Sequence, residues 1–239
     1  MSSENKINFF AVPYAGGIAE STYGKWQAPL GEEFNVIPLE PAGHGRRINT
    51  PFTDTMQATV DDLFERIKPF VLHDTPWVIY GHSMGTIVAY ELVRKVIAEG
   101  MQQPLGMFVS GRNGPEHRYT QLECHELTDN DLITQLKKVD GTPKELFAYP
   151  SLLKTFLPII RNDYKVIENY RYNQDNPTVM DGFITGFYSD NDRLVSKDSF
   201  EHWGFYCKGA FNIHQFSGHH FFIHDDYSQI CQLIRAQLL

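Results

Sequence analysis

Short runs of mostly hydrophobic residues alternate, in the first half of the chain, with longer stretches in which hydrophobic residues recur every three or four positions. The short runs occupy residues 7–12, 34–39, 77–80 and 106–109, and glycine, proline or serine lies at or just beyond the end of each. Short apolar runs bounded in this way are typical of strands buried on both faces of a parallel sheet. The intervening helical stretches, 55–72 and 86–98, therefore predict an α/β fold with a mainly parallel central sheet flanked by helices.

The alternation stops between residues 127 and 173, where the pattern predicts helices but no strand. Helices are expected at 129–139 and 151–172, and Pro158 is expected to start or kink the second one. A turn is predicted at 140–143, between the two helices.

Strand-like runs resume at 183–188 and 212–216, and a last helix is predicted at 227–239. We therefore expect one domain spanning 1–239, with a helical insertion at 115–178. From the pattern alone, this insertion either forms a lid over a site or simply completes the core.

Charge and cysteine content narrow the classes of function. The net charge is −8 at pH 7, which argues against the basic field that nonspecific nucleic-acid binding needs. The cysteines Cys124, Cys207 and Cys231 lack CxxC spacing, so neither a zinc site nor a disulfide framework is expected, and no metal is predicted.

The first residues lack the pattern of a signal peptide, and no apolar run approaches the roughly 20 residues of a membrane helix. We expect a soluble cytoplasmic protein.

The segment Gly81-His82-Ser83-Met84-Gly85 lies where a strand-like run changes to a helix-like one. A G-x-S-x-G pattern in this context predicts a nucleophile elbow, in which a tight turn exposes the serine hydroxyl at the carboxyl edge of the sheet. The amide of Met84, at the start of the helix, would then point to where an oxyanion forms.

A serine hydroxyl needs a base, and in this fold class the acid and then the histidine follow the serine in the chain. His219, just after the last predicted strand, is the expected base, and His220 is its main rival. Asp192, in the loop after the strand at 183–188, is the expected acid, and Asp190 is the alternative. For both aspartates, a plain turn-forming role stays open.

The second oxyanion donor is expected in the loop that follows the first strand. Pro13-Tyr14-Ala15-Gly16-Gly17 occupies this place, and its glycines allow close approach of the backbone to a ligand. Either Ala15 or Tyr14 offers the amide, and the alternative is a flexible Gly-Gly turn.

These residues resemble the type II thioesterases of nonribosomal peptide and polyketide biosynthesis, stand-alone enzymes of the α/β-hydrolase superfamily. The resemblance runs nearly from end to end. Its motifs lie at 10–17 (FAVPYAGG), 41–47, 81–85, 110–112 (SGR), 125–129, 141–143, 157–164 and 218–222 (GHHFF). Two departures are Ser189, where the acid loop usually has glycine, and His220, where phenylalanine often follows the histidine.

The resemblance implies a catalytic triad of Ser83, Asp192 and His219, with Met84 and Ala15 as the oxyanion hole. It further implies that Tyr14, Gly16 and Arg112 contact the substrate. The implied reaction is hydrolysis of acyl thioesters on the phosphopantetheine arms of carrier proteins, which removes aberrant or stalled acyl groups. No cofactor is implied, because the phosphopantetheine arm is part of the substrate, and the family suggests a monomer.

Two other classes of function stay open from the sequence. One is a general carboxylesterase or acyltransferase of the same fold, which would show no advantage from a carrier. The other is a non-catalytic module that binds an acylated partner. The combination of elbow serine, acid loop and histidine argues against the second, because binding alone does not need all three.

Overall fold

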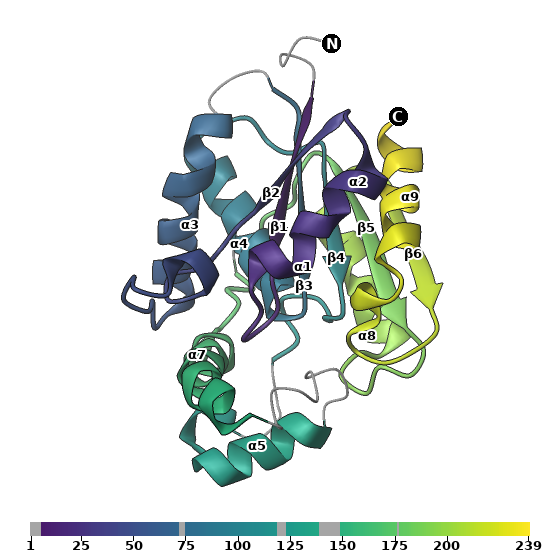
Figure 1. Ribbon diagram of the computed structural model, residues 1–239. Helices are drawn as coiled ribbons and strands as arrows, with labels where there is room; N and C mark the ends of the chain where they lie inside the picture. Colours follow the sequence, from purple (N-terminus) through teal and green to yellow (C-terminus); the bar gives the residue numbers. More distant parts are fainter. Residues whose placement is uncertain (1–5, 72–74, 119–122, 139–148, 176) are drawn as a thin grey trace.

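A parallel sheet of six strands forms the centre of the protein (Figure 1). The structure is a computed structural model that describes residues 6–71, 75–118, 123–138, 149–175 and 177–239. The strands are β1 (Ile7–Val12), β2 (Phe34–Pro38), β3 (Trp77–His82), β4 (Gly106–Ser110), β5 (Phe183–Ser189) and β6 (Phe211–Phe216). Their order across the sheet is β2-β1-β3-β4-β5-β6, and every pair of neighbours is parallel.

Side chains of successive strand residues lie on opposite faces, so each face of the sheet has its own hydrophobic core. On β1, Phe10 and Val12 belong to one core, whereas Phe9 and Ala11 belong to the other. All four side chains are almost completely inaccessible to solvent, which explains why these four consecutive residues are all hydrophobic.

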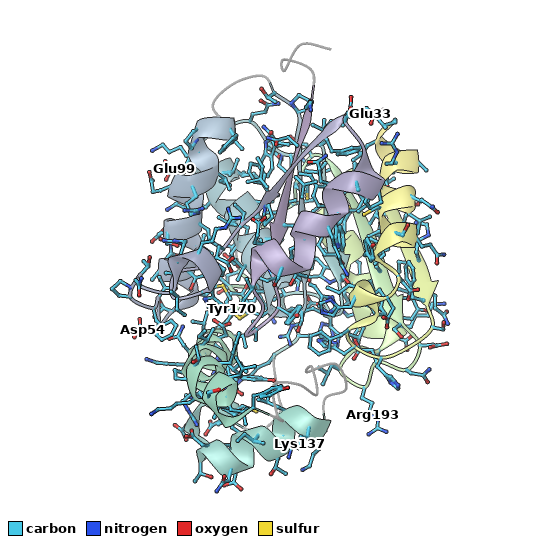
Figure 2. All side chains as sticks on the ribbon, in the orientation of Figure 1. Glu33, Asp54, Glu99, Lys137, Tyr170 and Arg193 are labelled. Carbon is cyan, nitrogen blue, oxygen red and sulfur yellow. The ribbon has the colours of Figure 1, made fainter. Side chains whose placement is uncertain are left out.

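Helices cover both faces, and Figure 2 shows side chains filling the space between them and the sheet. The core that contains Phe10 is closed by α3 (Met56–Val71), α4 (Met84–Ala98), α8 (Lys197–Glu201) and the 3₁₀ turn η5 (His202–Tyr206). The opposite core is closed by α1 (Ala19–Tyr23), η2 (Gly24–Trp26), α2 (Gln27–Leu30) and α9 (Tyr227–Leu238). Single 3₁₀ turns also occur at η3 (Gly45–Arg47), η4 (Cys124–Glu126) and η6 (Phe222–His224). This is an α/β-hydrolase-type arrangement.

Two described helices lie between β4 and β5 in the chain, α5 (Asp129–Lys138) and α7 (Pro150–Asn169). Figure 1 shows both beyond the carboxyl ends of the strands. They enclose a small hydrophobic cluster of their own, which includes Leu132, Leu136 and Leu157. The far end of α7 also reaches the main core, through Val166 and Ile167. The boundaries 115–178 for an insertion remain a prediction.

Pro158 lies inside α7 and neither starts nor ends it. The helix begins instead at Pro150, at the first turn, where a proline costs no hydrogen bond. The turn predicted at 140–143 lies outside the described residues. Among the described residues, no helix combines the length and the apolar composition required to cross a bilayer.

Candidate active site

Ser83 connects β3 to α4 in a strained backbone conformation. Its φ is 54° and its ψ is −120°, and it is the one non-glycine residue with positive φ in the described part of the chain. Such a conformation costs on the order of 1–3 kcal/mol and persists only where the surroundings enforce it. Here the Ser83 amide donates to the Ser110 carbonyl (2.8 Å), and the Thr86 hydroxyl contacts the Gly81 carbonyl (2.8 Å). The strand, the turn and the helix are thereby held as one unit.

The two glycines of the elbow are required by close approach of backbone atoms. A Cβ atom on Gly81 would lie 2.3 Å from the carbonyl oxygen of Gly85. A Cβ atom on Gly85 would lie 2.3 Å from the carbonyl oxygen of Val12, at the end of β1. Backbone atoms cannot rotate away as a side chain can, so both positions exclude larger residues.

Met84 is the first residue of α4, whose N-terminus carries a partial positive charge. The Ser83 side chain makes no capping hydrogen bond to this helix. The Ser83 side chain therefore does not occupy the first amides of α4, and the oxyanion role of Met84 remains a prediction.

Asp192 lies in the turn after β5 and contacts His220 directly. Its Oδ2 is 2.7 Å from His220 Nδ1, and both residues are 5% exposed. The other oxygen, Oδ1, accepts from the Leu194 amide (2.9 Å), which fixes the carboxylate plane. Asp190 is exposed, and its backbone amide pairs with Phe216 on β6. The geometry thus favours Asp192 as the acid, as predicted.

The base differs from the sequence prediction. His219 was the expected partner of the acid, but it is exposed, whereas the buried His220 pairs with Asp192. The chain leaves β6 through Gly218, whose φ is 114°, and this turn sends the side chains of the two adjacent histidines in different directions. The motif places the base directly after Gly218, at His219. In the structure, the histidine that contacts Asp192 is the second residue after Gly218, His220.

Ser83 and His220 line the same small cavity, of about 40 Å³. The predicted site residues Met84, Ala15, Tyr14 and Arg112 also line it. The remaining lining residues are Tyr164 and Ile167 of α7, Leu194 and Phe221. The fold thus collects residues from six separate parts of the chain around the elbow serine.

Gly16, which was expected to contact the substrate, is not among the residues that line this cavity. Its amide donates instead to Asp163 Oδ2 of α7 (2.7 Å). The same oxygen lies 2.8 Å from His44 Nε2, and both side chains are buried. The two loops that begin at Pro13 and Pro41 are thereby attached to α7 through one carboxylate.

The Asp163 carboxylate also determines the charge of His44. Burial alone would lower the pKa of His44, but the hydrogen bond and the charge of Asp163 outweigh burial and raise that pKa. Glu40 adds to the increase. His44 is therefore more readily protonated in the folded protein than in the unfolded chain.

His82, inside the elbow, is fully buried and packs against the base. Its ring centroid lies 5.0 Å from that of His220, and its Nδ1 is 2.9 Å from Ser110 Oγ. Burial lowers the pKa of His82 well below its ordinary value, and the nearby imidazoles of His220 and His224 lower it further. His82 therefore adds no positive charge beside the base.

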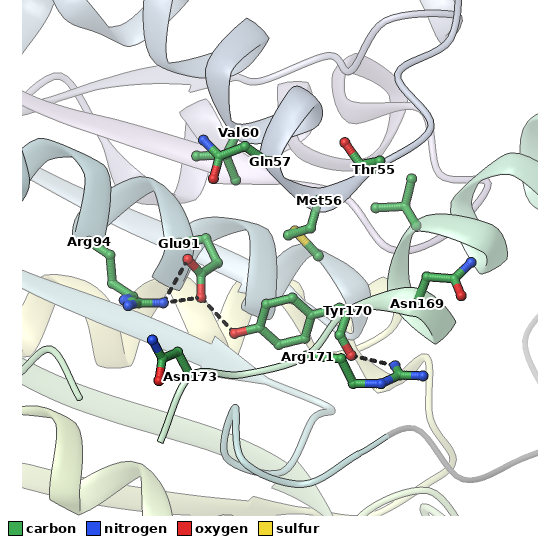
Figure 3. A pocket seen from close by; sticks show the side chains of 11 residues that line it. Thr55, Met56, Gln57, Val60, Glu91, Arg94, Asn169, Tyr170, Arg171 and Asn173 are labelled. Carbon is green, nitrogen blue, oxygen red and sulfur yellow. Dashed lines mark hydrogen bonds and ion pairs between the residues drawn. The ribbon is translucent and has the colours of Figure 1, made fainter. Parts of the chain in front are cut away.

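A larger cavity, of about 300 Å³, lies away from the elbow, between α3, α4 and the end of α7 (Figure 3). None of the predicted site residues lines it. Its wall contains the ion pair Glu91–Arg94 (2.8 Å), and Tyr170 donates to the same carboxylate (2.6 Å). Size alone would therefore select the wrong cavity, because the chemistry is concentrated in the smaller one.

A serine on a strained strand-to-helix turn shares a cavity with the histidine of a buried aspartate–histidine pair, at the carboxyl ends of parallel strands, and this combination defines a serine hydrolase of the α/β-hydrolase type. The profile of the thioesterase domain matches residues 8–238, and the chain belongs to this family. It is a thioesterase of the type II group that serves nonribosomal peptide and polyketide pathways.

Two of the curated relatives are of similar length to this chain. The chain is 30% identical to the gramicidin S biosynthesis protein GrsT of Aneurinibacillus migulanus, over 100% of this chain and 91% of that protein. It is also 30% identical to LgrE of Brevibacillus parabrevis, named linear gramicidin dehydrogenase, over 100% of this chain and 90% of that one.

Among solved structures, ClbQ from the colibactin pathway aligns with a TM-score of 0.91 at 31% identity, over 98% of this chain and 97% of its own. The type II thioesterase BorB from the borrelidin cluster aligns with a TM-score of 0.88 at 28% identity, over 100% and 95%.

The close approach at the elbow predicts that Gly85→Ala lowers stability by about 1–3 kcal/mol, the usual cost of overpacking. The reason is the 2.3 Å distance that the new Cβ would have to the Val12 carbonyl oxygen. Urea unfolding measures the effect. Gly24→Ala is the matched control, because Gly24 is in the helical region and meets only the flexible end of Glu20. Equal stability of Gly85→Ala and the wild type would contradict the packing.

The geometry of the base predicts that His220→Gln lowers kcat/KM for thioester hydrolysis by about 10⁴–10⁶-fold. His219→Gln, at the exposed neighbour, should change kcat/KM by less than about threefold. Both variants are assayed with the same acyl thioester after circular dichroism has verified the fold. A larger loss of kcat/KM in His219→Gln than in His220→Gln would identify His219 as the base.

The raised pKa of His44 predicts a pH-dependent contribution to stability. Because the pKa of His44 is higher in the folded protein than in the unfolded chain, protonation of His44 stabilises the fold. This stabilisation is complete at pH values below the unfolded-state pKa of about 6.5, and it disappears as the pH rises through the folded-state pKa. The difference in Tm between wild type and His44→Gln should therefore be larger at about pH 5.5 than at about pH 8.5. Asp163→Asn should remove the same effect, and the double variant should not be additive. A Tm difference that grows toward high pH would contradict this assignment.

Proposed function

We propose that this protein hydrolyses acyl thioesters on the phosphopantetheine arms of carrier proteins, and so removes aberrant or stalled acyl groups from an assembly line. The observation that carries the proposal is the 2.7 Å contact between Asp192 and His220, because His220 also lines one cavity with the strained Ser83. Membership of the type II thioesterase group supports thioesters as the substrate class.

In the acylation step, Ser83 Oγ attacks the thioester carbonyl while His220 Nε2 accepts the hydroxyl proton. Asp192 stabilises the imidazolium that forms, through its contact with Nδ1. The Met84 and Ala15 amides donate to the oxyanion, and loss of one such donor typically costs about 10²–10³ in rate. The carbon–sulfur bond then breaks, and the thiol leaves with the proton from His220.

In the second half of the reaction, water attacks the acyl-serine ester. His220 accepts a proton from this water and returns it to Ser83 Oγ as the ester bond breaks. The products are the free acid and the regenerated serine. Each proton that His220 takes up is released in the same half-reaction, so the resting enzyme is restored.

The cavity at Ser83 is too small for this substrate as it stands. Its volume is about 40 Å³, whereas sites for small molecules usually enclose about 300–1,000 Å³. Tyr164 and Ile167 of α7 form part of its wall. We therefore propose that α5 and α7 act as a lid and that α7 moves away to admit the arm. The Asp163 carboxylate, bound to Gly16 and His44, holds the closed position.

Two aromatic residues near the start of α7 do not line this cavity. Tyr149 is 57% exposed, and Phe156 packs against the small cluster between α5 and α7.

Arginines near the cavity could contact an acidic carrier domain. Arg47 pairs with Asp62 (2.6 Å), and Arg112 donates to the His117 carbonyl (3.0 Å). Arg46 lies 3.6 Å from Glu20 but is largely exposed, so it is the most accessible of the three.

The test compares three substrates: an acetylated carrier protein, acetyl-coenzyme A and a simple oxygen ester. We expect the highest kcat/KM with the carrier, and loss of at least about 10⁴-fold in Ser83→Ala. Equal or better turnover of the oxygen ester would identify a general esterase instead. Absence of Ser83-dependent turnover with all three would leave a binding module or an acyltransferase.

A further inference from the structure

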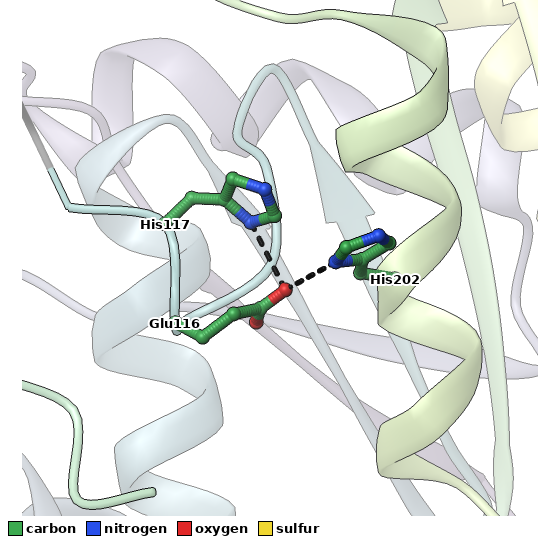
Figure 4. A group of neighbouring side chains, drawn as sticks. All are labelled: Glu116, His117 and His202. Carbon is green, nitrogen blue, oxygen red and sulfur yellow. Dashed lines mark hydrogen bonds and ion pairs between the residues drawn. The ribbon is translucent and has the colours of Figure 1, made fainter.

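Three potential metal ligands meet at the edge of the sheet, outside the residues that line the Ser83 cavity (Figure 4). Glu116 and His117 lie in the loop after β4, and His202 begins η5. Each offers one ligand atom, and the three atoms lie within 4.8 Å of one another. In the described part of the chain, no other group of three or more histidine, cysteine or acidic side chains meets this criterion.

The carboxylate is at the centre of the group. Glu116 Oε1 lies 2.7 Å from His202 Nδ1 and 3.0 Å from His117 Nδ1, and Figure 4 shows both rings directed at this oxygen. Zn²⁺ binds histidine nitrogen and carboxylate oxygen at about 2.0–2.2 Å in tetrahedral geometry. Such a tetrahedron separates neighbouring ligand atoms by about 3.3 Å. The two measured separations are close to this value, so small ring movements create the site.

One ligand lacks a satisfactory partner without a cation. His117 Nδ1 is buried and makes no hydrogen bond within the described structure, although Glu116 Oε1 lies 3.0 Å away. A buried polar nitrogen without a partner costs free energy, and coordination to a metal ion would remove this cost.

The carboxylate is prepared to act as a ligand. The Tyr206 hydroxyl donates to Glu116 Oε2 (2.6 Å), whereas Oε1 lies next to the two histidines. The Tyr206 hydrogen bond occupies the oxygen that does not face the histidines, and it orients the group as an outer-shell partner orients a metal ligand.

We propose that Glu116, His117 and His202 bind one divalent transition-metal ion of the Zn²⁺ class. Two imidazoles and one carboxylate suit Zn²⁺, Co²⁺ or Ni²⁺, whereas Mg²⁺ and Ca²⁺ prefer sites made of oxygen ligands. The fourth position is left to water. The proposal is independent of the reaction assigned to Ser83.

A metal here would stabilise one wall of the active site. Arg112 lines the Ser83 cavity, donates to the His117 carbonyl (3.0 Å) and accepts from Trp203 Nε1 at its own carbonyl (2.8 Å). Arg112 is thus hydrogen-bonded to both His117 and Trp203. His117 is one of the proposed ligands, and another, His202, directly precedes Trp203 in the chain. Coordination would therefore lock the loop after β4 to η5, on either side of Arg112. The ion acts as a clamp and takes no part in hydrolysis.

Sequence spacing gave no sign of this site. Cysteine spacing predicted no metal. The proposed ligands contain no cysteine and come from two segments that only the fold brings together. A Glu-His pair followed by one distant histidine has no distinctive spacing.

The test is titration of metal-free protein without a histidine tag, first with Zn²⁺ by calorimetry and then with Co²⁺ by visible absorption. We expect one ion per chain, the intense visible bands of four-coordinate Co²⁺, and a higher Tm with Zn²⁺. Glu116→Gln, His117→Gln and His202→Gln should each weaken Zn²⁺ binding by at least about 10-fold, the lower limit for loss of an outer-shell partner.

His214→Gln is the matched control, because His214 is a partly buried histidine on β6 outside the cluster, and its variant should bind Zn²⁺ like the wild type. Glu116→Gln preserves an acceptor for the Tyr206 hydroxyl, so weaker binding with an unchanged metal-free Tm would reflect ligation and not folding. Absence of stoichiometric binding to the wild type would overturn the proposal. Binding that survives all three cluster substitutions would overturn it equally.

Discussion

The active site depends on the close contact between the start of α4 and the end of β1. Gly85 lies so near the Val12 carbonyl that a single methyl group would collide with it. This contact leaves the connecting residue, Ser83, in a conformation that other residues in the described chain avoid unless they are glycine. The strain is small beside the burial of the strands on both sides of the turn, and it directs the serine hydroxyl out of the core. Parallel strand order then brings the acid loop and the histidine turn to the same edge.

Hydrophobic patterning could predict the sheet because the four inner strands, β1, β3, β4 and β5, are buried on both faces, whereas the edge strands β2 and β6 are only partly buried. All six strands were expected from their runs, with boundaries within about two residues of those found. The short elements α1, α2 and α8 were not expected, because four or five residues cannot show helical periodicity. Their positions are determined by tertiary packing, for example by Trp26 and Phe200, which are completely buried.

The types of residue that form the site could be predicted from the sequence, but the position of the histidine could not. The elbow could be identified because the glycines are required by backbone contact, which leaves a signature in the sequence. The choice between His219 and His220 depends on the turn at Gly218, and a one-residue shift exchanges a buried side chain for an exposed one. The role of Asp163 was likewise hidden, since nothing in the sequence of α7 indicates that its carboxylate binds Gly16 and His44.

Helix α7 contacts both the Ser83 cavity and two loops of the core. The helix contributes Tyr164 and Ile167 to the wall of the Ser83 cavity and Asp163 to the buried bonds with two core loops. Movement of this helix would therefore enlarge the cavity and break those bonds together. On the other side of the cavity, Arg112 is held by its contacts with His117 and Trp203. The proposed movement of α7 and the fixed position of Arg112 would together suit the proposed substrate, a thioester on a long flexible arm.

The most direct test of the account is mass spectrometry of the protein after reaction with a fluorophosphonate, which labels a serine only when a base activates it. The account predicts one adduct, on Ser83, that forms at the wild-type rate in His219→Gln and is lost in His220→Gln. An adduct on another residue, or labelling of Ser83 that requires His219 and not His220, would contradict it.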